Sequence, residues 1–117
     1  MRTVDKEKQT SYSVLSVDDD EEMIGLLHEV VSQLGHASVT AIDGVDALEK
    51  LGESEFDIVI TDISMPQMNG IELTKRIKTD FEDIDVVVVT GYQEEYKYTD
   101  VIEIGASDFI SKPFNIN

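Results

Sequence analysis

The sequence predicts an α/β fold in which helices cover both faces of a parallel sheet. Short apolar stretches rich in β-branched residues alternate with amphipathic stretches, which is typical of strand–helix units joined by right-handed crossovers. The four valines from Val86 to Val89 need apolar cover on both sides, as strands of parallel sheets do. A chain of 117 residues is long enough for one such domain.

Five strands are predicted from the apolar stretches. Each is short and is followed by a turn signal or by the start of a helix. The predicted strands span residues 13–17, 37–41, 57–61, 85–90 and 107–110. Residues 1–12 are polar with mixed charge, and we expect them to form a flexible tail before a single domain at 13–117.

The first predicted helix begins after Asp20, and Gly35 ends it. Glu21 and Glu22 lie in its first turn, where the helix dipole favours negative charge. Apolar residues follow at helical spacing: Met23, Leu26, Leu27, Val30, Val31 and Leu34.

Three further helices are predicted between the later strands. Asp43 can cap the second. The third spans residues 70–78, and the fourth spans residues 93–104 and is ended by Gly105. The residues expected on the inner faces are Val45, Leu48 and Leu51 in the second helix, and Leu73, Thr74 and Ile77 in the third.

The composition excludes several classes of function. A net charge of -16 argues against direct binding to nucleic acid or to an anionic membrane, because both need a positive surface. The absence of cysteine excludes disulfides and thiol catalysis, and two histidines leave little for a histidine metal site. We find no apolar run that could span a bilayer and no signal-peptide core, so a cytoplasmic location is expected.

Polar side chains stand at the ends of four predicted strands. Asp62 follows the third strand, Asp18-Asp19 the first, Thr90 the fourth and Lys112 the fifth. Each of these residues has an ordinary structural explanation when taken alone. Because the carboxyl ends of parallel strands meet at one edge, where open α/β sheets bind ligands, the set together indicates a functional site.

The chemistry of this set indicates phosphoryl transfer. Clustered carboxylates repel one another, and Mg²⁺ removes that conflict, since it prefers oxygen ligands and is held by carboxylates plus a phosphate. Thr90 and Lys112 would bind phosphoryl oxygens. Without a suitably placed Ser, Cys or His nucleophile, a carboxylate is the natural acceptor.

Four segments of the chain closely resemble the receiver domain of two-component response regulators, such as the chemotaxis regulators. One segment is residues 57–70, which contains Asp62 and ends in the specific turn Met65-Pro66-Gln67-Met68-Asn69-Gly70. An equally specific one is the ending Gly105-Ala106-Ser107-Asp108-Phe109-Ile110-Ser111-Lys112-Pro113-Phe114. The others are residues 14–21, with Asp18-Asp19, and residues 86–91.

The resemblance implies a flavodoxin-like sheet with strand order 2-1-3-4-5. It implies that Asp62 accepts a phosphoryl group from a sensor histidine kinase or a phosphotransfer protein, and that the domain then switches to control an output partner or domain. The roles that it implies are Mg²⁺ binding by Asp18, Asp19, Asp62 and the Ser64 backbone carbonyl, phosphoryl contacts by Thr90 and Lys112, switching by Thr90 and Phe109, and a cis Lys112-Pro113 peptide bond. Enzymatic activity beyond self-phosphotransfer and autodephosphorylation is not expected.

The chain departs from the resemblance at its end. A receiver domain has a last helix after the Lys-Pro-Phe turn, and the chain ends at Asn117. We therefore expect exposed apolar surface on the side of the sheet that carries the first helix, and self-association through it.

Two alternatives stay open. A phosphatase of the haloacid-dehalogenase type would use Asp18 as nucleophile and Asp20 as acid, but it leaves Asp62 without a role. The second alternative is a receiver-like binding module that is never phosphorylated. The substitution Asp62→Asn separates the readings, because it abolishes phosphorylation only where Asp62 is the acceptor.

Overall fold

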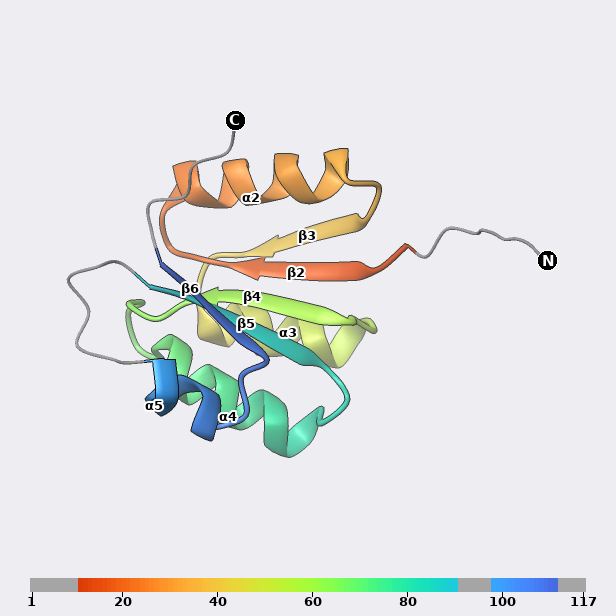
Figure 1. Ribbon diagram of the computed structural model, residues 1–117. Helices are drawn as coiled ribbons and strands as arrows, with labels where there is room; N and C mark the ends of the chain where they lie inside the picture. Colours follow the sequence, from red (N-terminus) through yellow and green to blue (C-terminus); the bar gives the residue numbers. More distant parts are fainter. Residues whose placement is uncertain (1–10, 91–97, 112–117) are drawn as a thin grey trace.

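The computed structural model describes residues 11–90 and 98–111 as strands and helices in strict alternation (Figure 1). The elements are β2 (Ser13–Val17), α2 (Glu21–Gln33), β3 (Ala37–Ala41), α3 (Gly44–Glu53), β4 (Ile58–Asp62), α4 (Gly70–Asp80), β5 (Asp85–Thr90), α5 (Tyr98–Glu103) and β6 (Asp108–Ser111). Among these residues, no helix is both long and apolar enough to cross a membrane.

The strands form one parallel sheet of five strands in the order β3-β2-β4-β5-β6. In chain order this is 2-1-3-4-5, so the predicted flavodoxin-like fold is confirmed. The order reverses between β2 and β4, which lie side by side at the centre of the sheet. Ligands of such sheets bind at the carboxyl ends of the strands beside this reversal.

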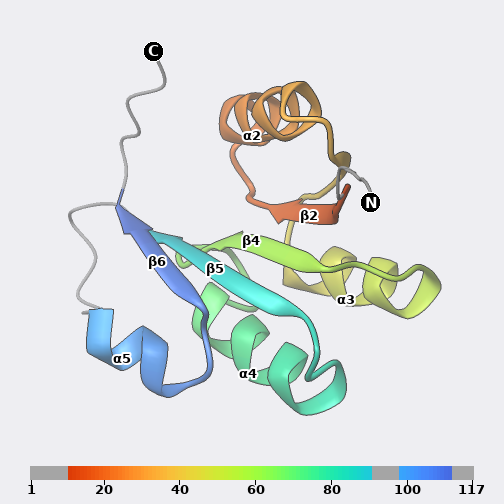
Figure 2. The same ribbon diagram turned by 45° about the vertical axis from the view of Figure 1, so that its right-hand side comes forward.

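The two faces of the sheet are covered unequally. In Figure 2, α3, α4 and α5 lie on one side of the sheet and α2 on the other. The main hydrophobic core is on the three-helix side, where Leu15, Val59, Val86 and Val88 are fully buried. On the other side, α2 packs on β2 and β3.

Beside α2, the sheet is only partly covered in the described part of the chain. Ile58, Ile60 and Val87 are half-buried, and Ile110 is 41% exposed. These side chains share the α2 face, because residues paired across parallel strands point the same way and Ile60 pairs with Val87. Exposed apolar surface on this side of the sheet was expected from the sequence.

Strand boundaries follow the prediction closely. β2, β3 and β5 have the predicted bounds, while β4 and β6 each begin and end one residue later than predicted. At the start of β4, the Asp57 carboxylate accepts the Ser13 N–H (2.8 Å) and so links the beginnings of β4 and β2. At its end, Ile63 N–H donates to Val89 O (3.1 Å), which carries the ladder past Asp62.

The helix boundaries are also close to the prediction. Asp43 caps α3 by accepting the Asp46 N–H, and Gly35 follows α2 with a positive φ of 92°. In α4 the predicted inner residues Leu73, Thr74 and Ile77 are all buried. Of the predicted helix at 93–104, residues 93–97 lie outside the described part, and α5 begins at Tyr98.

The covered faces of α2 and α3 differ in part from the apolar faces seen in the sequence. Of the apolar residues of the first predicted helix only Val31 is buried, and Leu34 is 69% exposed. α2 lies on two strands at one side of the sheet, so only a narrow stripe of it is covered. In α3 the predicted inner residue Leu51 is buried and Leu48 packs against the core, whereas Val45 is 45% exposed and the small residues Gly44 and Ala47 are buried in its place.

Candidate functional site

Three aspartates converge at the carboxyl ends of the central strands. Asp18 and Asp19 follow β2 directly, and Asp62 is the last residue of β4. One carboxylate oxygen from each lies within 4.8 Å of the other two. Asp18 and Asp62 are buried, with exposed fractions of 2% and 7%, and Asp19 is exposed. Three carboxylates at this spacing repel one another strongly, and the two buried ones are poorly screened by water.

Local backbone contacts fix the position of Asp18. Its N–H donates to Ala41 O of β3 (3.2 Å), and its Oδ1 accepts the N–H of Asp20 (2.9 Å). Asp20 in turn is the N-cap of α2, since its carboxylate accepts the Glu22 N–H. The acidic residues after β2 therefore have two roles. Asp20 caps α2, and Asp18 and Asp19 lie beside Asp62 at the carboxyl ends of the strands.

The peptide that joins Asp62 to Ile63 holds the Asp62 carboxylate. The N–H of Ile63 lies 2.9 Å from Asp62 Oδ1, and the carbonyl oxygen of Asp62 accepts the Thr61 hydroxyl at 3.0 Å. Gly70 packs against the same peptide, and a Cβ atom built on Gly70 would overlap Asp62 O and lie 2.9 Å from Ile63 Cα. The acceptor candidate is thus held through its backbone from two neighbouring segments.

The loop after Asp62 returns sharply to the sheet. Gly70 N–H donates to Ile63 O (2.8 Å), and Met68 N–H donates to Pro66 O (2.7 Å). Gln67, between them, has a φ of 71°, a left-handed conformation that is uncommon outside glycine. Asn69 then starts α4 with a reciprocal capping box to Glu72. These turns bring the N-terminus of α4 against the strand end that carries Asp62.

The other predicted site residues differ in position and in burial. Thr90 is the buried last residue of β5, one position beyond Val89, the partner of Asp62 in the sheet. Ser64 is exposed two residues after Asp62, and Phe109 is half-buried in β6 opposite Val88. Lys112 and the Lys112-Pro113 bond lie outside the described residues.

The sequence analysis did not predict the contact of Thr61 with the Asp62 backbone, and it placed Gly70 in the turn and at the start of a helix without predicting its contact with Asp62. Thr61 was part of an apolar strand, where a buried threonine normally serves packing. Asn69 and Glu72 have the spacing of a capping box, which supports the predicted helix start at Gly70 but does not indicate how closely Gly70 approaches Asp62.

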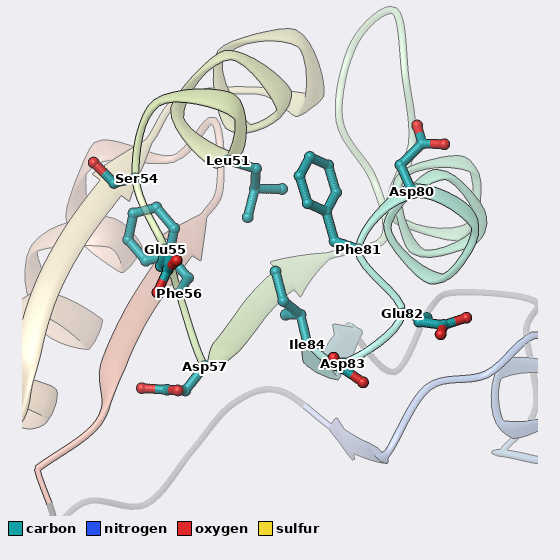
Figure 3. A pocket seen from close by; sticks show the side chains of 10 residues that line it. All are labelled: Leu51, Ser54, Glu55, Phe56, Asp57, Asp80, Phe81, Glu82, Asp83 and Ile84. Carbon is teal, nitrogen blue, oxygen red and sulfur yellow. The ribbon is translucent and has the colours of Figure 1, made fainter.

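A separate pocket lies at the opposite end of the sheet (Figure 3). Its volume is about 520 Å³, and it lies before β4 and β5, at the ends of α3 and α4. In Figure 3, Leu51, Phe81 and Ile84 are at its centre, with carboxylates around them. The lining residues are Leu51, Ser54, Glu55, Phe56, Asp57, Asp80, Phe81, Glu82, Asp83 and Ile84. This lining has no cation and would repel a phosphoryl group, so the pocket is not part of the site.

Known proteins share both the sequence pattern and the fold. A family model of the response regulator receiver domain matches residues 14–117. The alkaline phosphatase synthesis transcriptional regulatory protein PhoP of Bacillus subtilis is 31% identical over 102 residues, which are 87% of this chain and 42% of PhoP.

Two solved structures are similar over most of their own length. The chemotaxis protein CheY4 of Vibrio cholerae has a TM-score of 0.82 at 29% identity, covering 91% of this chain and 90% of CheY4. The response regulator TrrA of Thermotoga maritima, solved in complex with Mg²⁺ and BeF, has a TM-score of 0.79 at 30% identity, with 89% of each chain covered.

The chain belongs to the response regulator receiver domain family. Its role as a phosphoacceptor in two-component signalling follows from the family, and neither the haloacid-dehalogenase phosphatase nor the non-phosphorylated module is favoured. The chain spans less than half the length of the first curated relatives that it matches, 42% of PhoP and 49% of CrdR from Helicobacter pylori.

Proposed function

We propose that Asp62 is the phosphoacceptor of this receiver domain. The observation that carries the proposal is the convergence of Asp62 with Asp18 and Asp19 within 4.8 Å at the reversal of the strand order. Of the three, Asp62 alone lies at the end of a strand with its own Oδ1 held by the next backbone N–H. A buried carboxylate in a fixed orientation is suited to in-line attack on a phosphorus atom.

The donor set fits Mg²⁺. Two buried carboxylates and one exposed carboxylate, all oxygen donors within 4.8 Å, suit a hard dication that retains water ligands. Asp18, Asp19 and Asp62 would hold the ion, with the Ser64 backbone carbonyl beside them. Bound there, Mg²⁺ would offset the charge of the carboxylates and of the incoming phosphoryl group.

In the transfer step, a carboxylate oxygen of Asp62 attacks the phosphorus of a phosphohistidine on a sensor histidine kinase or a phosphotransfer protein. The bond between phosphorus and the imidazole nitrogen breaks, and an acyl phosphate forms on Asp62. Thr90 and Lys112 would bind the phosphoryl oxygens, and Thr90 and Phe109 would change conformation together. The acyl phosphate would later hydrolyse within the domain itself.

The readout would be an output domain or a separate effector. PhoP and CrdR are transcriptional regulatory proteins, and this chain covers 42% and 49% of them, so a covalently joined output domain is one route. We further propose self-association through the open sheet face around Ile60 and Ile110. A cytoplasmic location, the cis Lys112-Pro113 bond and the boundary between residues 12 and 13 stay predictions.

The test is the intact mass of the protein after incubation with acetyl phosphate and Mg²⁺, beside the variant Asp62→Asn. We expect one phosphoryl group on the wild type, and none on the variant or after chelation of the metal. A phosphoryl group that persists on Asp62→Asn would move the acceptor elsewhere, with Asp18 the first position to check by peptide mapping. Phosphorylation by a purified histidine kinase then tests the donor.

A further inference from the structure

We infer that Thr61 is a positioning residue for the phosphoacceptor, acting through the peptide bond between Asp62 and Ile63. The inference rests on the proposed role of Asp62. Thr61 is fully buried in β4, between Val17 of β2 and Val88 of β5. Its side chain points to the three-helix side of the sheet, away from the carboxylate that it would control.

The contact chain has two hydrogen bonds and one peptide group. The Thr61 hydroxyl donates to Asp62 O at 3.0 Å. On the other side of the same rigid peptide, Ile63 N–H donates to Asp62 Oδ1 at 2.9 Å and to Val89 O at 3.1 Å. Because a peptide group is planar, a rotation that moves its carbonyl also moves its N–H. The hydroxyl therefore limits the rotation that would carry Ile63 N–H away from the Asp62 carboxylate.

Gly70 makes this orientation of the peptide possible from the opposite segment. Its N–H donates to Ile63 O at 2.8 Å, and its missing side chain leaves the space that the Asp62 carbonyl occupies. Glycine permits the close approach but donates nothing to the Asp62 carbonyl itself. A side-chain hydrogen bond to that oxygen comes instead from Thr61.

Packing alone does not call for a hydroxyl at this position. A valine would fill nearly the same volume and is a better strand former in a fully buried site. The neighbouring strand offers a contrast, because the buried hydroxyl of Ser16 has no hydrogen-bond partner among the described residues. The Thr61 hydroxyl is directed at one backbone atom, and that atom belongs to the residue that we propose to be phosphorylated.

A set of four variants tests the inference. Thr61→Val keeps the volume and removes the hydroxyl, whereas Thr61→Ser keeps the hydroxyl and removes a buried methyl group. Ser16→Ala removes a buried hydroxyl from the adjacent strand as the matched control. Asp62→Asn reports on the proposed function. The rate of phosphorylation is measured across acetyl phosphate concentrations at saturating Mg²⁺, and it is corrected for the folded fraction from urea unfolding.

We expect Thr61→Val to lower the maximal rate about tenfold with little change in the acetyl phosphate concentration for half-maximal rate, because misplacement acts on the transfer step. Thr61→Ser should stay within about threefold of the wild type, as should Ser16→Ala. A role in packing alone predicts the opposite order, since serine leaves a cavity and valine does not.

Equal phosphorylation rates for Thr61→Val and the wild type would overturn the inference. It would also be overturned if the rates of the two Thr61 variants ranked in the same order as their free energies of unfolding. Failure of the proposed function is separable from these outcomes. It would show as phosphorylation that survives Asp62→Asn, whatever the Thr61 variants do.

Discussion

At the scale of the residue, the site brings together carboxylates that repel one another. Asp18 and Asp62 are buried carboxylates within reach of each other and of Asp19, and each has a backbone N–H on its Oδ1. Those contacts hold the charges in place but do not remove their mutual repulsion. The folded domain therefore carries a local electrostatic cost that a bound cation would offset.

Asp18→Asn should stabilise the domain in the absence of metal, by about 1 to 3 kcal/mol, because it removes one of three clustered charges while its side-chain oxygen can still accept the Asp20 N–H. Urea unfolding in a chelating buffer measures this. The wild type should gain about 1.4 kcal/mol when Mg²⁺ is raised to ten times its dissociation constant, and the variant much less. A variant that Mg²⁺ stabilises as strongly as the wild type would exclude Asp18 as a ligand.

Gly70→Ala should disrupt the site or the fold, because the added Cβ would overlap the Asp62 carbonyl oxygen and lie 2.9 Å from Asp62 C. A backbone shift is required, and we expect a loss of about 2 kcal/mol or more in the free energy of unfolding and of most phosphorylation. The matched control is Gly25→Ala in α2, where nothing lies within 4 Å of the new Cβ. It should gain about 0.5 to 1 kcal/mol, since alanine favours helix. Similar effects of the two substitutions would contradict the close contact at Gly70.

At the scale of the element, α4 is the helix that shapes the site. Its capping box fixes its first turn, its buried face of Leu73, Thr74 and Ile77 holds it on the core, and its first residue lies against Asp62. Thr74 adds a hydroxyl bond to Gly70 O at 2.7 Å. The turn at residues 65–70 thus also determines how closely α4 approaches the sheet.

Asn69→Ala should cost about 1 kcal/mol of stability, because it removes the side-chain acceptor of the Glu72 N–H at 2.9 Å. Urea unfolding followed by circular dichroism measures the loss. Asn69→Asp keeps the acceptor and should be close to the wild type. An alanine variant as stable as the wild type would show that the cap makes no net contribution.

At the scale of the whole molecule, one face of the sheet is well covered and the other, the open face, is only partly covered by the described residues. Three helices bury the first, and within the described residues one helix, α2, lies on the second. The net charge of -16 opposes any association of two copies. Hydrophobic association through the open face should therefore depend on salt.

Sedimentation velocity should detect an associated species whose fraction rises between low salt and about 0.5 M NaCl, where repulsion between copies is screened. Ile110→Ser should reduce it, because Ile110 is 41% exposed on the open face. Leu34→Ser, at a residue that is 69% exposed at the end of α2, serves as the control and should leave it unchanged. A wild type that stays monomeric at high salt and high concentration would exclude self-association through this face.

Local patterns in the sequence determined the order of elements, the parallel sheet and the rim at which Asp18, Asp19 and Asp62 meet. Strand and helix periods are local properties, and parallel strands bring their carboxyl ends together whatever the details of packing. Only the tertiary structure decided which apolar residues of α2 and α3 are covered, since that depends on where each helix lies on the sheet. It also decided that Gly70 touches the Asp62 backbone and that the Thr61 hydroxyl points to the Asp62 carbonyl. These contacts arise from backbone geometry and close approach between segments, which residue identity alone does not encode.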